Sequence, residues 1–394
     1  MTWCCRVLWR AKRGAMVGFS PEKMLIVVVH TDALVATKRW LASRLLALVG
    51  GSFVLFGCSA GSGERYTLLQ GATMGTYYRI QSACPAAPTA AAIEAQLQAF
   101  NLVFSTYEAG SELSRLNDNS TTDWVSISAD LFGVLSAAAE LAGTSAGGFD
   151  PTVGALVELW GFGVAEPERE PPTPAAIESA RVNTGLDVMQ LRQGPSASPQ
   201  VRLLQSRRID LSALAKGRAV DELADRLVAQ GCTDLLVDIG GEIRVLGRSP
   251  KERPWRLAVE QPGELAPGNE ALPVLQLTAG AVATSGDYRN FRELSGERYS
   301  HLIDPRTGYP VTHGLASVTV WHPQAMWADG FATLVSVVGP EEGQALAEQA
   351  KLAVAMLIRT TQGFASWQSS EFRRRFGHAA KATQRTSYSQ DSRR

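Results

Sequence analysis

The sequence predicts an α+β fold with mixed, largely antiparallel sheets and flanking helices. Two observations support this prediction. Predicted strands outnumber predicted helices, and many neighbouring strands are joined by short glycine-containing turns, as in hairpins. The chain has neither a Gly-x-Gly-x-x-Gly after a strand nor a Walker lysine motif, so a Rossmann or P-loop site is not indicated.

The composition is that of an ordinary globular protein, with 45% hydrophobic and 19% charged residues among 394. A formal net charge of zero hides an asymmetry. Residues 1–57 carry eight Lys or Arg against two Asp or Glu, and the remainder carries 30 against 36. Because the body of the chain is mildly acidic, we expect no nucleic-acid partner.

Residues 38–58 read as a bacterial lipoprotein signal. A basic start (38–44) precedes a short apolar run (45–57) and Cys58. That run is shorter than the roughly 20 residues of a membrane-spanning helix, which disfavours the alternative of a transmembrane anchor. We therefore expect residues 1–57 to be an upstream extension plus a removed signal. Cys58 would be lipidated and 58–65 a tether, anchoring the protein to a membrane of the cell envelope on the periplasmic side.

Cys84 and Cys232 are the cysteines that follow Cys58. They could pair in an oxidising compartment, but they are far apart in sequence and fit no metal-ligand spacing. We therefore expect two separate buried thiols.

The elements are expected within one domain over residues 66–366, which opens with a strand, a glycine break and a second strand over 66–80. The basic segment 367–394 has few large apolar residues and is expected to be disordered. Apolar spacing predicts the other elements: helices at 89–103, 129–142, 218–230, 328–338 and 341–350, and strands at 235–239, 242–247, 255–261, 274–284, 316–321 and 352–360.

Residues 210–221 place Asp210, Ser212 and Lys216 at the start of an amphipathic helix. Helix starts bind anions because their first N–H groups are unpaired and the helix dipole is positive there, and Lys216 adds a full charge. This pattern is typical of a phosphate-ester site. Asp210 could then bind a ribityl or ribose hydroxyl or help to place a cation. The alternative is a plain N-cap.

His301 and Asp304 lie three residues apart before a Pro/Gly turn. Positions i and i+3 of an extended segment point to opposite faces, so a tight turn is needed to bring both to one site. A neutral imidazole could serve as a general base. The alternative is a structural histidine.

Asp329 and Thr333 lie at i and i+4 near a predicted helix start, where both can direct oxygens at one hard cation such as magnesium. The alternative is that Asp329 caps the helix and Thr333 bonds a backbone carbonyl. Three more glycine turns carry acids or hydroxyls, at 147–152, 238–242 and 283–288. Each alone is ordinary turn chemistry.

Eight segments occur in a fixed order along the chain. They are Gly-Ala-Thr-Met-Gly-Thr (71–76), Phe-Ser-Thr-Tyr (104–107) with 111–117, Gly-Gly-Phe-Asp-Pro-Thr-Val-Gly (147–154) with 159–163, the segment at 210, Asp-Ile-Gly-Gly-Glu (238–242), Ala-Thr-Ser-Gly-Asp-Tyr (283–288), His-Leu-Ile-Asp-Pro-Arg-Thr-Gly (301–308) and Ala-Asp-Gly-Phe-Ala-Thr (328–333). Together they resemble the FAD:protein FMN transferase family, also called ApbE-like. The resemblance implies a T-fold-related domain and a magnesium-dependent transfer of the FMN half of FAD onto a Thr or Ser of a target flavoprotein, releasing AMP. It also agrees with a lipoprotein signal, because members are often exported lipoproteins.

The resemblance assigns roles by matched position. His301 would be the base with Asp304 as its neighbour, and Asp329 and Thr333 would hold magnesium together with main-chain oxygens of Ala213 and Ala332. Arg218 stands where an aromatic residue is expected. FAD contacts would come from Met74, Tyr107, Gly148, Phe149, Asp150, Asp210, Lys216 and Ile303.

Two other functions remain open. If water replaced the acceptor hydroxyl, the protein would be a metal-dependent FAD pyrophosphatase that yields FMN and AMP. The protein could also be a lipoprotein that binds flavin without catalysing a reaction. The presence of His301 and of the Asp329/Thr333 pair argues against this, because binding flavin requires neither a base nor a metal.

Overall fold

The computed structural model describes residues 66–164, 170–261, 263–287 and 290–377. The predicted signal over 1–57, Cys58, the tether over 58–65 and residues 378–394 lie outside the described residues. Among the residues that are described, no helix combines the length and apolar character needed to cross a membrane.

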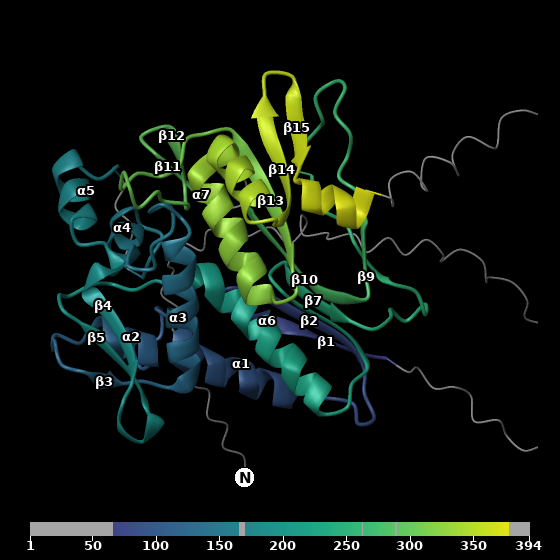
Figure 1. Ribbon diagram of the computed structural model, residues 1–394, viewed down its shortest axis with the longest axis horizontal. Coiled ribbons are helices and arrows are strands. Elements are labelled where there is room, and N and C mark those ends of the chain that lie inside the picture. The colour runs from purple at the N-terminus through teal and green to yellow at the C-terminus, as the bar shows by residue number, and fades with distance from the viewer. Residues whose placement is uncertain (1–65, 165–169, 262, 288–289, 378–394) are drawn as a thin grey trace, which may run out of the picture. The chain divides into compact units, whose positions relative to one another are not determined.

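A large antiparallel sheet dominates the fold (Figure 1). Within the described residues, eight strands join in the order β1-β2-β6-β7-β10-β13-β14-β15, and every neighbouring pair is antiparallel. The prediction of an α+β fold with largely antiparallel sheets is therefore confirmed. The strands are β1 (Thr67–Thr73), β2 (Thr76–Ala83), β6 (Asp234–Ile239), β7 (Glu242–Leu246), β10 (Ala279–Gly286), β13 (Leu315–His322), β14 (Ala353–Thr360) and β15 (Gly363–Gln368).

Both faces of this sheet are covered, which explains why every residue of a central strand such as β6 is buried. Alternate side chains of β6 point to opposite faces, so Leu235 and Val237 join one core cluster and Leu236 joins another. On the first face lie α1 (Ala90–Phe104), α6 (Ser212–Ala229) and α7 (Ala325–Gln349). The opposite face is covered by the hairpin of β8 (Trp255–Leu257) and β9 (Leu275–Leu277) and by a short helix over 370–377.

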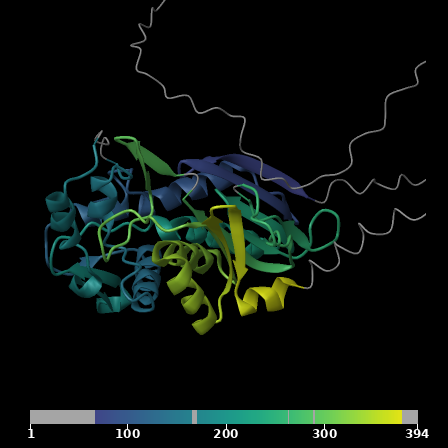
Figure 2. The same ribbon diagram turned by 90° about the horizontal axis from the view of Figure 1, so that it is seen from above.

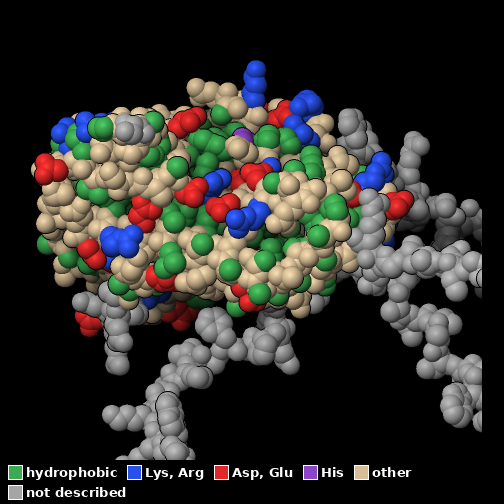
Figure 3. Space-filling view, turned by 90° about the horizontal axis from the view of Figure 1, so that it is seen from below, with side chains coloured by type: hydrophobic (Ala, Val, Ile, Leu, Met, Phe, Trp, Pro, Cys, Tyr) green, Lys and Arg blue, Asp and Glu red, His purple; other side chains and the backbone are tan. Residues whose placement is uncertain are grey.

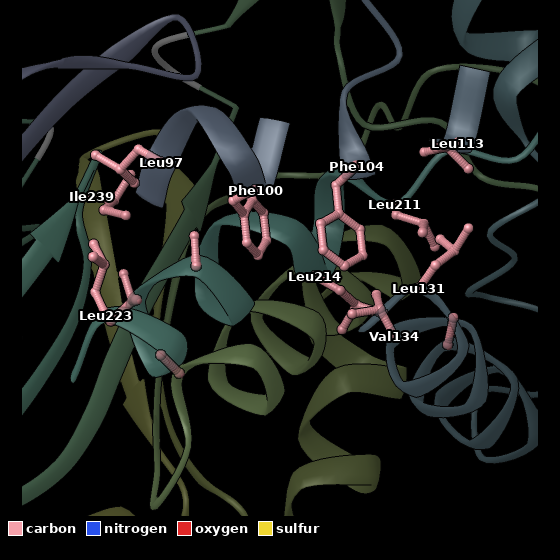
Figure 4. Close-up of a cluster of buried hydrophobic side chains, with 14 of the residues drawn as sticks. Leu97, Phe100, Phe104, Leu113, Leu131, Val134, Leu211, Leu214, Leu223 and Ile239 are labelled. Atoms are coloured by element: carbon pink, nitrogen blue, oxygen red, sulfur yellow. The ribbon is translucent and has the colours of Figure 1, made fainter. Parts of the chain in front are cut away.

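The main core forms where α1 and α6 meet the sheet and α3 (Ala129–Gly143). Figure 4 shows Phe100 and Phe104 of α1 directed toward Leu214 of α6 and Val134 of α3. These side chains recur at helical spacing and are at most 5% exposed. Their burial fixes the first turns of α6, where the anion site was predicted.

A second group of elements lies beside this core, on the left of Figure 2. Its sheet has the order β3-β5-β4 and was only partly predicted, because its strands are short. The group comprises α2 (Glu112–Asn117), α4 (Gly154–Leu159), α5 (Pro174–Arg181), β3 (Val125–Ser126), β4 (Met189–Gln193) and β5 (Pro199–Leu203).

Helix α7 replaces the two helices predicted at 328–338 and 341–350. It is kinked at Gly339, whose φ of +86° favours glycine, and Pro340 follows. A Cβ at Gly339 would also clash with the His313 ring. The kink therefore depends on both the conformation and the small size of this residue.

The expectation of two separate thiols is wrong, because Cys84 and Cys232 form a disulfide. Sequence separation concealed the pairing. β2 lies beside β6 in the sheet, and Thr233 N–H donates to Ala83 O at 3.3 Å, which brings the end of β2 next to the residue that precedes β6.

The expectation of disorder from residue 367 is wrong as far as residue 377. β15 continues to Gln368, and Ser369 Oγ accepts a hydrogen bond from Phe372 N–H at the start of the terminal helix. Phe372 and Phe376 are at most 4% exposed in the core cluster on the second face of the sheet. Two aromatic side chains on one helical face outweigh the basic character of this segment.

Candidate active site

The predicted anion site forms at the start of α6, which begins at Ser212 and not at residue 218. Asn117 holds Ile209, three residues before the helix, because its side chain both accepts from Ile209 N–H and donates to Ile209 O at 2.8 Å. Asp210 Oδ1 accepts from Ser212 N–H at 2.7 Å, which forms an Asx turn before the helix. The N-cap residue itself is Leu211, so Asp210 is not the N-cap of the alternative reading. The other carboxylate oxygen of Asp210 is not used by this bond.

The glycine turn at 147–152 lies against Asp210, because Asp210 N–H donates to Pro151 O at 2.7 Å. Phe149 is buried, and its N–H donates to Ser145 Oγ. Asp150 accepts from the N–H and hydroxyl of Thr152. Gly148 packs so tightly that a Cβ there would overlap Val338 of α7. The turn is thus held between α3, α6 and α7.

Lys216 lies between two buried acids. Its Nζ is 3.4 Å from Glu242 Oε1 and 3.7 Å from Asp329 Oδ2. Both acid side chains are 5% exposed, whereas the side chain of Lys216 is 32% exposed. Burial raises the pKa of Asp329 to about 7, an effect that the charge of Lys216 partly opposes. Burial alone would lower the pKa of Lys216, but the two carboxylates raise it, so the ammonium stays charged.

The position of Asp329 is set by the crossing of α6 and α7. Gly217 N–H donates to Asp329 Oδ2 at 3.0 Å, and a Cβ on Gly217 would overlap the backbone of Ala325. Asp221, one turn further along α6, caps α7 by accepting from Ala325 N–H and Met326 N–H at 2.9 Å each. One helix therefore caps the other and fixes its first turns.

The residues predicted to hold magnesium lie on these two crossing helices. Asp329 and Thr333 are one turn apart on α7, Ala332 is buried between them, and Ala213 lies in the first turn of α6. The set offers one carboxylate, one hydroxyl and two main-chain carbonyls, all hard oxygen donors that suit magnesium. Among the described residues, no group of three or more His, Cys, Asp or Glu could hold a metal ion, so a cation here would depend on the hydroxyl and main-chain oxygens.

A further buried acceptor lies beside Lys216, on Glu242. Glu242 Oε2 is buried and has no hydrogen-bond partner among the described residues. A buried carboxylate oxygen without a partner is costly and calls for a water or a cation.

His301 follows the hairpin of β11 (Phe291–Leu294) and β12 (Glu297–Ser300), which the sequence patterns did not predict. Its Nδ1 lies 2.9 Å from Asn290 O. A carbonyl oxygen can only accept, so Nδ1 carries the proton and Nε2 of the neutral ring is left as the proton acceptor. Burial lowers the pKa of His301, and the charge of Lys216 lowers it further. The imidazole is thus kept neutral, as a base requires.

Asp304 is engaged elsewhere. Its carboxylate forms a bidentate ion pair with Arg306, with Arg306 Nη2 2.8 Å from Oδ2, and it accepts from Arg306 N–H. Arg306 also pairs with Glu342 of α7. These contacts give Asp304 a turn-forming role, and they offer no support for a catalytic one beside His301.

Tyr107 links the part of the site around Asp210 to the part around His301. Its hydroxyl donates to Phe162 O at 3.3 Å, and the Phe162 ring packs edge-on against His301. Partial burial raises the pKa of Tyr107, and the nearby charge of Asp210 raises it further. The ring is 66% exposed, which leaves a large aromatic face open beside Asp210. Such a face suits the stacking of a planar ligand.

The remaining predicted FAD contacts are Met74 and Ile303. Met74 and Gly75 form the β1–β2 turn with φ of +47° and +70°, a twist that matches the adjoining strands. Ile303 is 6% exposed and packs against Leu156, Trp160 and Ile177, so its side chain belongs to a small core. A ligand contact at Ile303 would therefore come from its backbone.

One residue of this cluster, Glu242, was missed by sequence reasoning. The turn at 238–242 was noted for its glycines, yet nothing in its pattern assigned the acid to Lys216. The usable signal was an acid placed directly after Gly240 and Gly241, which follow the strand that carries the apolar run Leu235-Leu236-Val237. Nearby Asp238 shares this environment, and burial raises its pKa to about 6.

On the face shown in Figure 3, acidic and basic side chains are interspersed with hydrophobic ones, and no large area carries a single sign. The charges that matter for the site are therefore those of individual residues such as Lys216 and Asp329.

Comparison with known proteins shows which family the chain belongs to. The sequence profile of the ApbE family matches residues 74–358, which include Met74 and every later site residue named above. The chain belongs to the ApbE family. Among similar curated members, a protein named FAD:protein FMN transferase from Haemophilus influenzae is 38% identical over 314 residues, covering 78% of this chain and 90% of that protein. Its namesake from Vibrio cholerae is 37% identical over 336 residues, covering 83% and 97%.

Solved structures of ApbE proteins share the fold. Flavin transferase ApbE from Vibrio cholerae superposes with a TM-score of 0.71 at 36% identity, covering 79% of this chain and 99% of that one. The apo form of Pseudomonas stutzeri flavinyl transferase ApbE gives 0.72 at 33% identity, covering 79% and 97%. The family resemblance drawn from the ordered segments is thereby confirmed.

Proposed function

We propose that this protein transfers the FMN half of FAD onto a Thr or Ser hydroxyl of a target flavoprotein, releasing AMP, in a magnesium-dependent reaction. The names of its relatives support the reaction class. The observation that carries the proposal for this chain is a neutral His301 held within the field of Lys216, which itself lies on the buried Asp329 and Glu242. A base and a phosphate-binding cation are thus combined in one site.

The phosphate end of FAD would bind at the start of α6. Lys216 is charged and partly exposed, and the first N–H groups of α6 add a positive field. By matched position, FAD contacts would come from Tyr107, Asp210 and Met74, and from the turn that contains Gly148, Phe149 and Asp150. Ile303 would contribute through its backbone.

Magnesium would be held by Asp329 and Thr333 with main-chain oxygens of Ala213 and Ala332. When bound, the ion would neutralise charge on the pyrophosphate as the phosphorus–oxygen bond breaks. The protein's own part is to fix these oxygens on two crossed helices and to keep Asp329 buried, since a buried carboxylate binds a cation more strongly than a solvated one.

His301 would activate the acceptor. Its Nε2 accepts the proton of the Thr or Ser hydroxyl while that oxygen attacks the FMN-side phosphorus. The bond from this phosphorus to the bridging oxygen breaks, and AMP leaves with that oxygen. The Nδ1 bond to Asn290 O keeps the ring in the required tautomer.

We also propose that the chain is exported and held by a lipid on Cys58 at the periplasmic side of a bacterial membrane. The disulfide between Cys84 and Cys232 supports an oxidising compartment. Cys58→Ala should leave an active enzyme that no longer fractionates with membranes. Continued membrane association of that variant would argue for another attachment.

One experiment separates transfer from its alternatives. The protein is incubated with FAD and magnesium, with and without a threonine-bearing flavoprotein domain, and the nucleotides are quantified. Transfer predicts AMP that appears together with labelled acceptor and little free FMN. Rapid release of free FMN without acceptor labelling would indicate a pyrophosphatase, and FAD that persists unchanged would indicate a binding protein.

A further inference from the structure

Glu242 is a buried acid to which the proposed reaction gives no role. It is the first residue of β7, directly after Gly240 and Gly241, whose φ values of +65° and +108° turn the chain sharply between β6 and β7. Only 4% of Glu242 is exposed. Burying a carboxylate is unfavourable, so its presence calls for an explanation beyond the turn itself.

The two oxygens of Glu242 differ in their surroundings. Oε1 lies 3.4 Å from Lys216 Nζ, whereas Oε2 is buried without a hydrogen-bond partner among the described residues. A Cβ on Gly240 would come into contact with both Thr76 and Oε2, which places this oxygen beside the β1–β2 turn that carries Met74. Glu242 therefore lies between the strand turns and the start of α6.

Lys216 is shared between Glu242 and Asp329. Nζ is 3.7 Å from Asp329 Oδ2, and the two acids lie on different elements, β7 and α7. Without the charge of Glu242, Asp329 would be the remaining anion of the two. The ammonium would then close onto Asp329, the carboxylate that is proposed to hold the cation.

We propose that Glu242 is a positioning residue that holds the Lys216 ammonium off Asp329 and directed toward the pyrophosphate of FAD. This inference rests on the proposed function, since that function makes the pyrophosphate of FAD the anion that Lys216 binds. Glu242 acts here through Lys216 and does not contact the reacting atoms.

The test is a double-mutant cycle read by binding. Magnesium-free titrations with FAD, followed by flavin fluorescence, are made on the full folded protein and on Glu242→Gln, Lys216→Met and the double variant. Each single variant should bind FAD about tenfold more weakly, the scale of one lost charge-assisted hydrogen bond. The double variant should bind no more weakly than Lys216→Met, because Glu242 has nothing left to position.

Asp234→Asn is the matched control. Asp234 is a buried acid at the other end of the β6–β7 hairpin, where its Oδ1 accepts from Arg248 N–H at 2.7 Å. This variant should lower the melting temperature and leave FAD affinity unchanged. If Glu242→Gln behaves in the same way, Glu242 is a structural residue and the inference is wrong.

The remaining outcomes are also decisive. Full additivity of the two single effects would show that Glu242 acts independently of Lys216 and would overturn the inference. Non-additive losses support it. Transfer by the wild type is measured separately, so that FAD binding without any transfer would remove the proposed function while the cycle still reports the link between Glu242 and Lys216.

Discussion

The main-chain N–H of Gly217 donates a hydrogen bond to Asp329 Oδ2 at 3.0 Å, joining the first turns of α6 and α7. The close approach of the two helices at this bond explains why a glycine follows Lys216, because a Cβ there would overlap the backbone of Ala325. Any side chain would separate the two helices and move Asp329 away from Lys216.

Gly217→Ala should therefore damage both stability and activity. The added Cβ would overlap the backbone of Ala325 and Met326, which cannot move aside as a side chain can. We expect a loss of about 1–3 kcal/mol in the free energy of unfolding, the usual range for overpacking. Urea unfolding measures it, with Gly133→Ala, at an uncrowded position of α3, as the control. A fully stable and active Gly217→Ala would contradict the close approach of the helices.

Asp329→Ala should abolish transfer mainly by loss of the cation. The change removes the carboxylate among the four proposed ligands and leaves Lys216 paired with Glu242 alone. Excess magnesium should restore activity only in part. Calorimetric titration with magnesium gives a second readout, and wild-type magnesium affinity in this variant would exclude Asp329 from the metal site.

The sequence predicted several elements well, because periodicity alone specifies them. The two longest helices were less well predicted, since α6 begins six residues earlier than expected and α7 was expected as two helices. Strands such as β6 and helices such as α3 depend on neighbouring residues of the chain and were found within one or two residues. The β11–β12 hairpin was missed because its short, charged strands lack alternation, and its turn at Ser295 and Gly296 was the remaining signal.

Pairings across the fold were harder to predict. The Cys84–Cys232 disulfide spans 148 residues, and the Lys216–Glu242 contact requires β7 to lie beside α6. Neither follows from local pattern. The roles proposed for Lys216, Asp329 and His301 rest on motifs that are local in the sequence. The ion pair between Asp304 and Arg306 is local as well, but a carboxylate three residues after a histidine suggested a different role.

The disulfide leads to a stability prediction. Closing a loop of 148 residues restricts the unfolded chain, and the chain-entropy estimate for a loop of this length is about 5 kcal/mol. Replacing Cys84 and Cys232 by Ser should lower the free energy of unfolding by an amount of this order. The bond lies at the end of β6 opposite to Glu242, so FAD affinity below the melting transition should be unchanged. A variant as stable as the oxidised wild type would contradict this account.

The pH dependence of turnover follows from His301. Burial holds the pKa of this imidazole below its ordinary value of about 6.5, and a base must be neutral to accept a proton. At saturating magnesium, which favours the ionised form of Asp329, turnover should therefore stay level as the pH falls from 8 to about 6.5 and decline only below that. Rates at saturating FAD and acceptor measure it. A decline that begins above pH 7 would indicate that another group titrates.

Replacement of the base gives the companion prediction. His301→Asn should retain FAD affinity within a few fold, because binding relies on Lys216 and the start of α6. Turnover should fall by roughly 10²- to 10⁴-fold, the usual contribution of a positioned base. Loss of FAD binding with turnover preserved at saturation would make His301 a cofactor contact instead.

The central claim is that this site attaches FMN to a protein hydroxyl, and mass spectrometry of a co-expressed acceptor domain tests it most directly. The wild type with FAD and magnesium should add one FMN moiety to a Thr or Ser of the acceptor, and His301→Asn should leave the acceptor almost unmodified over the same period. An acceptor that gains no mass with the wild type, while FAD is bound or hydrolysed, would contradict the account.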